Sequence, residues 1–213
     1  MKKNKRQVVA GLFATALLVA SGIAIGAGSG WTVISSPSPN SKNLLAAVSG
    51  TSDSDVWAVG SQFDANQNQT ILAEHWDGTN WTVSPTPNPG THLCAPDWQN
   101  LMTGVYMAAT SDVWAVGTQC TASDNYNTLV EHWNGTAWSV IPSPNKQGGE
   151  TENPGSTLAA VAGSSSNDVW AAGSWAGGAW PNNGGGTLIE HWNGEKWPSF
   201  QARVPPPTSS TTI

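Results

Sequence analysis

Basic residues are scarce in this chain, and half of them lie at its very start. Lys and Arg number eight among 213 residues, and four of the eight precede residue 7. From residue 31 onward, four basic residues stand against fourteen acidic ones, a net charge of −10. A protein that binds nucleic acid needs clustered Lys and Arg to displace the counterions of the phosphates. The sequence therefore excludes nucleic acid as a partner.

Cysteine is also rare, since Cys94 and Cys120 are the only two. In an exported protein such a pair predicts a disulfide. Closing a loop of about 25 residues would stabilise the fold by roughly 3 kcal/mol if the bond acts through chain entropy. A metal or catalytic role is the weaker alternative, because no histidine is near in the sequence except His92.

Long apolar runs are confined to the N-terminus, where residues 8–27 carry no charge. A basic stretch precedes this run and small residues follow it, which is typical of a signal peptide. We therefore expect residues 1–30 to be a cleaved export signal and the remainder to be secreted or extracellular. The run is also just long enough to span a bilayer, so a membrane anchor formed by residues 8–27 is the alternative.

Phe and Tyr together number five, whereas Trp numbers thirteen. Ten of these Trp occupy equivalent positions in a sequence motif that recurs at a spacing of 56 to 59 residues. Its first part reads Asp-Val-Trp-Ala-Val/Ala-Gly and begins at Asp55, Asp112 and Asp168. Its second part reads Glu-His-Trp-Asp/Asn-Gly and begins at Glu74, Glu131 and Glu190. A period of this length predicts a repeat architecture.

Each repeat contains four short apolar segments separated by turn residues, which predicts four antiparallel strands. The first strand of each repeat is expected at residues 44–49, 101–108 and 158–162. The Asp-Gly or Asn-Gly that follows the third segment predicts a two-residue hairpin loop. Counting outward from that loop pairs Glu74 with Trp81, and Glu131 with Trp138.

The repeated sequence motif resembles the tryptophan-rich, kelch-like repeats of exported bacterial β-propellers, in the broad superfamily that includes the propeller domain of galactose oxidase. The resemblance covers Trp31 to Trp197. It implies an all-β, β-propeller-type fold with three four-stranded antiparallel blades plus an N-terminal closing strand, which is an incomplete ring. The segments expected are the closing strand at 31–36, blade 1 at 44–84, blade 2 at 101–141, blade 3 with a degenerate last strand at 157–204, and a Pro/Ser/Thr tail at 205–213.

Three blades are fewer than the four to eight with which propellers usually close. Two explanations are open at this point. The chain is a truncated, non-functional piece of a longer propeller, or it is a half-ring that a homodimer or missing blades complete.

No enzymatic site is expected from the sequence. The oxidase of the superfamily uses a copper site with a Cys–Tyr crosslink, and no matching set exists here, where Tyr106 and Tyr126 are the only tyrosines. There is no Gly-x-Ser-x-Gly nucleophile motif, and no loop has the periodic acidic residues of a dedicated calcium site. We therefore expect no catalytic residue, no cofactor and no metal.

The repeated Trp and His are expected to build the scaffold, because a residue present in every unit usually serves the unit itself. This set comprises Trp57, Trp114, Trp170, Trp76, Trp133, Trp192, His75, His132 and His191. Adjacent Glu and His on a strand point to opposite faces. We expect the His to hydrogen-bond a turn or a neighbouring repeat, the Glu to accept from an indole or backbone N–H, and the Asp at the start of each motif to accept backbone N–H groups in its turn.

The unrepeated loops all lie at one end of the expected strands, because up-and-down order puts the loops after the second strand beside those that join the repeats. Variable loops on a rigid scaffold are a usual place for binding. Their aromatic residues are Phe63, Trp98, Tyr126, Trp175 and Trp180.

Flat rings flanked by amides and carboxylates suit carbohydrate, although the alternative is that the rings only cap the core. We therefore expect an exported binding or scaffold module that contacts an extracellular glycan or surface polymer. A propeller enzyme is the least favoured alternative.

Overall fold

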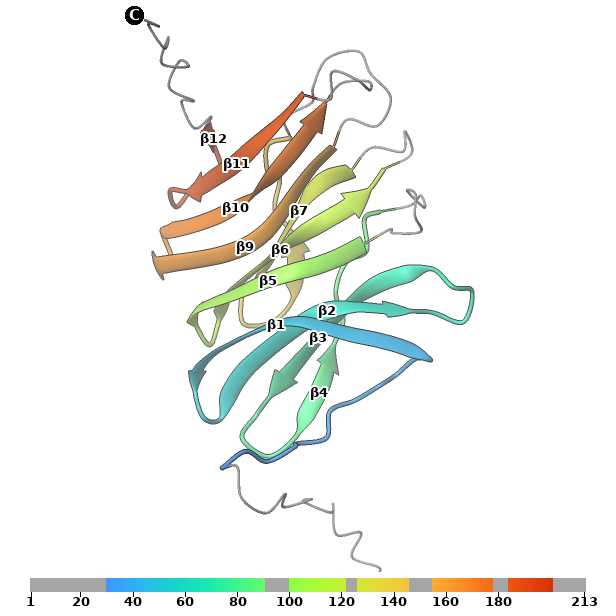
Figure 1. Ribbon diagram of the computed structural model, residues 1–213. Helices are drawn as coiled ribbons and strands as arrows, with labels where there is room; N and C mark the ends of the chain where they lie inside the picture. Colours follow the sequence, from blue (N-terminus) through green and yellow to red (C-terminus); the bar gives the residue numbers. More distant parts are fainter. Residues whose placement is uncertain (1–29, 91–99, 122–125, 146–154, 178–183, 201–213) are drawn as a thin grey trace, which may run out of the picture. The chain divides into compact units, whose positions relative to one another are not determined.

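The computed structural model describes residues 30–90, 100–121, 126–145, 155–177 and 184–200 (Figure 1). The chain divides into a small unit, Met1–Ser35, and a larger unit, Ser36–Ile213. The described part of the larger unit contains twelve strands. They are β1 (Lys42–Ser52), β2 (Asp55–Phe63), β3 (Gln69–Trp76), β4 (Trp81–Ser84), β5 (Asn100–Ala109), β6 (Asp112–Cys120), β7 (Tyr126–Trp133), β8 (Trp138–Val140), β9 (Gly155–Ser165), β10 (Asp168–Gly177), β11 (Gly184–Trp192) and β12 (Ser199–Phe200).

The strands form one four-stranded sheet and one eight-stranded sheet. The first has the antiparallel order β1-β2-β3-β4. The second consists of two antiparallel runs, β5-β6-β7-β8 and β9-β10-β11-β12, joined by a single parallel pair between Tyr126 and Gly155. We call β1–β4, β5–β8 and β9–β12 repeats 1, 2 and 3. The expectation of an all-β fold with four antiparallel strands in each repeat is confirmed.

The first strands of the three repeats, β1, β5 and β9, which we call the innermost strands, lie side by side. β1 contacts β5, and β5 contacts β9, while the other strands of each repeat extend away from this row (Figure 1). Two hydrogen bonds cross the row: Met107 N donates to Ser49 Oγ at 3.1 Å, and Thr103 Oγ1 donates to the Leu158 carbonyl at 2.7 Å. The repeats are therefore stacked in sequence order.

Glycine ends the Asp-Val-Trp motif because the neighbouring strand leaves no room for a side chain. A Cβ atom at Gly60, Gly117 or Gly173 would lie 1.9 Å from a main-chain oxygen of the preceding strand. At each place the first strand of the repeat carries a register shift close to this contact, at residues such as Leu45/Ala47 and Met102/Gly104. The bulge brings the two backbones together, and only glycine fits there.

The hairpin between the third and fourth strands differs from the expectation. Its loop has four residues, so that Trp76 pairs with Trp81 and Glu74 with Val83; the expected pairs Glu74 with Trp81 and Glu131 with Trp138 are wrong. The Asp77 carboxylate accepts the N–H groups of Thr79 and Asn80 at 2.8 and 2.7 Å, which closes the longer turn. Within this loop, only Gly78 has a positive φ, at 91°, whereas a two-residue type I′ loop requires two residues with positive φ.

The core lies between the repeats rather than within them. One apolar cluster joins Trp57, Val59, Ile71 and Ala73 of repeat 1 to residues of repeat 2 that include Met102 and Val105. A second cluster joins Trp114, Val116 and Val130 of repeat 2 to residues of repeat 3 that include Leu158 and Trp197. We call the side of a repeat that carries Trp57, Trp114 or Trp170 its forward face, and the side that carries the pair Trp76–Trp81, Trp133–Trp138 or Trp192–Trp197 its rear face.

The closing strand expected at residues 31–36 is not formed, since these residues have no strand conformation. The outer position beside β11 is instead taken by β12. A strand needs a free neighbouring edge for its hydrogen bonds, and β12 occupies this one. The described residues contain no closed ring of sheets. What the structure establishes is an all-β repeat fold with a four-stranded and a mixed sheet.

Candidate binding surface

One end of the sheets gathers the ends of β2, β6 and β10 with the starts of β3, β7 and β11 (Figure 1). Three of the five aromatic residues expected at this end are described and lie on these strands. Phe63 ends β2, Tyr126 begins β7, and Trp175 lies two residues before the end of β10. Trp98 and Trp180 lie outside the described residues. We call the surface made by these strand ends the long-loop edge.

In repeat 1 the long-loop edge combines an aromatic ring, a cation and amides. The half-buried ring of Phe63 has the Lys42 Nζ atom 5.2 Å from its centroid, a cation–π distance. Asn40 Nδ2 donates to Gln62 Oε1 at 2.8 Å beside it. This part of the edge therefore offers apolar ring surface together with hydrogen-bonding groups.

Asp64 follows Phe63 and organises the turn into β3. Its carboxylate accepts the backbone N–H groups of Asn66 and Asn68, both at 2.8 Å, and the Asn68 amide at 2.9 Å. The hydrogen bonds from Asn68, with a smaller one from Asn66, lower the pKa of Asp64. The carboxylate thus serves the turn.

In repeats 2 and 3 the aromatic residues of the edge are half-buried. Tyr126 pairs with Cys120 on one side and, through the parallel bridge, with Gly155 on the other. Trp175 pairs with Ser156 and Gly186, and a Cβ atom at Gly186 would lie 2.9 Å from the Trp175 indole nitrogen. Glycine at residue 186 therefore leaves space for the Trp175 ring above its own sheet.

Of the two cysteines, only Cys120 lies within the described residues. Cys120 ends β6 and is buried, with 1% of its surface exposed. Cys94 lies outside the described residues. The disulfide between them stays a prediction.

The opposite end of the sheets carries an Asp–His–Trp cluster in every repeat. His75 Nε2 lies 2.8 Å from Asp55 Oδ1, and the equivalent distances for His132 and His191 are both 2.7 Å. The Trp57 ring packs on His75 at a centroid distance of 4.8 Å. The imidazole therefore ties the end of the third strand to the turn before the second.

Asp55 also connects two repeats. Its Oδ2 atom accepts the hydroxyl of Thr51 and that of Thr110 from repeat 2, both at 2.7 Å. Burial opposes ionisation of Asp55, but the hydrogen bonds from His75, Thr110 and Thr51 outweigh it and lower its pKa. The expectation that this carboxylate accepts backbone N–H groups is wrong, because side-chain donors reach it first.

A buried glutamate on each rear face is the feature that sequence reasoning misjudged. Glu74, Glu131 and Glu190 are all 0% exposed, and neither carboxyl oxygen of any of them has a hydrogen-bond partner in the part of the chain that is described. The expected acceptance from an indole or backbone N–H is therefore wrong; the indole nitrogens of Trp57 and Trp114 are likewise unpaired among these residues. The sequence did contain a signal for this burial: side chains alternate between the two faces of a strand, which puts Glu74 on the same face as the apolar Leu72 and Trp76.

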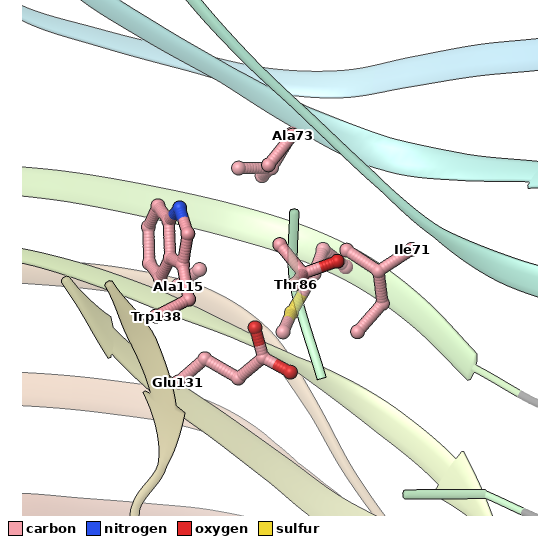
Figure 2. Close-up of a pocket in the computed structure, with 8 residues that line it drawn as sticks. Ile71, Ala73, Thr86, Ala115, Glu131 and Trp138 are labelled. Carbon is pink, nitrogen blue, oxygen red and sulfur yellow. The ribbon is translucent and has the colours of Figure 1, made fainter. Parts of the chain in front are cut away.

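Glu131 shows the surroundings of these glutamates. It lies between repeats 1 and 2 among Val59, Ile71, Ala115 and Trp138, and its carboxyl group points toward Thr86 (Figure 2). The space left there does not admit a water molecule. Burial raises the pKa of Glu131 to about 8. The side chain is therefore held as a neutral carboxylic acid at neutral pH.

The pKa values of the other two glutamates are raised as well. Burial raises the pKa of Glu190 to about 8 and raises that of Glu74. The hydroxyls of Ser143 and Ser36 lie close enough to offset part of these shifts, although they do not reach normal hydrogen-bond geometry. All three acids are sealed from solvent, so we do not assign them to the candidate surface. Glu131 lies between two repeats, whereas Glu74 lies on the outer, rear face of repeat 1 with Ser36 beside it.

Among the described residues, no three His, Cys, Asp or Glu side chains are grouped so that they could hold a metal ion. The same part of the chain contains no helix that is long and apolar enough to cross a membrane. The apolar run at 8–27, for which we expect a signal peptide or an anchor, lies outside it.

The fold and its repeated clusters define a class: this is a tryptophan-rich, all-β repeat protein. No protein-family model matches the chain, and no curated protein matches it significantly. The kelch-like resemblance therefore finds no support beyond the repeated residues themselves.

Proposed function

We propose that the protein is an exported, non-catalytic binding module that holds a carbohydrate or another polyhydroxylated surface polymer at the long-loop edge. One observation carries the proposal. Phe63, Tyr126 and Trp175 come from three different repeats and emerge at the same end of the strands. A stacked repeat scaffold thereby presents several rings along one edge, which suits an extended ligand better than a small one.

The chemistry of the edge fits sugars. Aromatic faces stack against the C–H groups of a pyranose, and the hydrogen-bonded amides of Asn40 and Gln62 place polar groups beside the Phe63 ring for its hydroxyls. Trp98 and Trp180 would add two rings by their place in the sequence. A disulfide from Cys94 to Cys120 would tie the loop that carries Trp98 to the end of β6.

We further propose that each repeat is a propeller-type blade. The four-strand antiparallel order of every repeat, the row of innermost strands and the apolar packing between repeats support this assignment. Under it, the long-loop edge is one rim of the blades.

The proposal is tested by screening soluble oligosaccharides on a glycan array and measuring any hit by calorimetry. Trp175→Ala should weaken binding about fivefold, since one stacking ring contributes about 1 kcal/mol. Trp170→Ala is the matched control, because Trp170 lies on the same strand at its other end. Phe63→Ala provides a second variant if Trp175→Ala lowers the melting temperature. If no saccharide binds at millimolar concentration, or if both tryptophan variants weaken binding equally, the proposed function is wrong.

A further inference from the structure

The two outer faces of the row of repeats expose side chains whose counterparts are buried inside it. Trp170, on the forward face of repeat 3, is 45% exposed, whereas Trp57 and Trp114 are each 2% exposed. Val48, on β1 of repeat 1, is 66% exposed, whereas Val105 at the same place in repeat 2 is 8% exposed. The outer faces are therefore built like the inner ones.

The inner faces pack in one consistent way. The Trp57 ring lies 5.0 Å from the rings of both Trp133 and Trp138 on the rear face of repeat 2. The Trp114 ring packs on the rear face of repeat 3 in the same manner, 4.8 and 5.5 Å from the two rings there. Each forward tryptophan is thus received by a tryptophan pair of the next repeat.

The rear face of repeat 1 already contains such a pair. The rings of Trp76 and Trp81 lie 5.7 Å apart at 44°, close to the 6.0 Å and 48° of Trp133 and Trp138. Trp81 is only half-buried, whereas Trp138 is 6% exposed. A receiving site for a forward tryptophan is therefore preorganised, which lowers the cost of association.

We propose that a second copy of this chain docks head-to-tail, so that Trp170 of one copy packs on the Trp76–Trp81 pair of the other while Val48 and Leu45 cover the rest of the forward face of repeat 3. The partner is identified by continuity with the two interfaces inside the chain, which join the same kinds of faces. Two copies supply six repeats, within the four to eight at which rings of such sheets close. A closed dimer contains this contact twice.

One polar contact distinguishes the proposed interface from those inside the chain. Thr110 donates a hydrogen bond to Asp55 across the interface of repeats 1 and 2, and strand register places Asp53 at the position of Thr110 in repeat 1. In the dimer Asp53 would approach Asp168, and the two carboxylates would repel. Asp53→Thr should therefore tighten the dimer.

The test is the mass of the purified full chain by light scattering after size exclusion. A single chain has a mass of 22.2 kDa, and twice this value is expected. Val48→Asp should raise the dissociation constant roughly a hundredfold, because it buries an unpaired charge in the contact. Trp170→Ala should also give monomers. Val140→Asp is the matched control, since Val140 is exposed on the outer strand of repeat 2 and should leave the dimer intact.

A mixture of the two monomeric variants distinguishes a head-to-tail contact from a symmetric one. Val48→Asp keeps an intact forward face and Trp170→Ala keeps an intact rear face, so that mixing them should restore dimers through one contact. A monomeric wild type, open chains that grow with concentration, a dimer insensitive to Val48→Asp, or no dimer on mixing would each overturn the proposal. Oligosaccharide binding to the long-loop edge does not require this contact, so the two proposals fail independently.

Discussion

Replacing Glu131 by Gln should remove a large part of the pH dependence of stability. In the unfolded chain this carboxyl ionises near its usual pKa of 4.5, whereas in the folded protein burial raises the pKa to about 8. Between these two values the folded state holds a proton that the unfolded state has lost. The contribution is therefore fully present below pH 4.5, and the free energy of unfolding falls as pH rises toward about 8.

The size of the effect follows from proton linkage. One pH unit corresponds to 1.36 kcal/mol per proton taken up on folding. Integrating between pH 5 and pH 7, one such glutamate lowers the free energy of unfolding by about 2.5 kcal/mol. Glu190 acts in the same direction with the same raised pKa. Glu131→Gln keeps the shape of the neutral acid and cannot ionise, so its loss over this interval should be smaller than that of the wild type by about 2.5 kcal/mol.

Urea unfolding followed by tryptophan fluorescence at pH 5 and pH 7 measures this difference. The comparison requires that the dependence on urea concentration, the m-value, stays the same in both proteins. Glu195→Gln is the control for the loss of one acidic group, because Glu195 is exposed in the turn after β11. If Glu131→Gln and the wild type lose the same free energy between the two pH values, the glutamate is not held neutral and the reasoning is refuted.

Two further predictions concern the backbone contact and the cysteine pair. Gly117→Ala should lower the free energy of unfolding by about 3 kcal/mol, since its Cβ would lie 1.9 Å from the Leu101 carbonyl oxygen; an unchanged urea midpoint would contradict the close approach. Reducing the protein, or replacing Cys120 by Ser, should cost roughly 3 kcal/mol if Cys94 and Cys120 are bonded. Two thiols that react with Ellman's reagent in the unfolded, non-reduced protein would show that the bond is absent; unfolding is needed because Cys120 is buried.

Much of the local structure was predictable because it depends on residues close in the sequence. Turn residues on either side of apolar segments indicated four strands in each repeat, and these strands are present. Alternation along a strand correctly put Glu74 and His75 on opposite faces, and His75 reaches the turn residue Asp55. The loop after Trp76 was misjudged because the Asp77 side chain, and not only the Asp-Gly backbone preference, closes the turn.

For the candidate site, the sequence predicted only that its aromatic residues lie at one end of the strands. Up-and-down strand order places Phe63, Tyr126 and Trp175 at one end of the sheets, but their half-burial depends on neighbours such as Lys42 and Gly186. The closing strand at residues 31–36 was predicted from its similarity in sequence to β4 and β8. A similar sequence forms a strand only where the edge of a neighbouring strand is free to hydrogen-bond. Strand formation at that place depends on whether another strand already occupies the edge, as β12 does.

The sequence by itself determined the repeat, the all-β fold and the side of the strand on which each motif residue lies, because these follow from spacing and from the two-residue period of a strand. Only the tertiary structure decided that the core lies between repeats, that Glu131 is buried with no hydrogen-bond partner among the described residues, and that Trp170 and Val48 stay exposed while their counterparts are buried. Burial is a property of the surface that packs against a residue. Three copies of one motif can therefore have three environments, set by what stacks on each face.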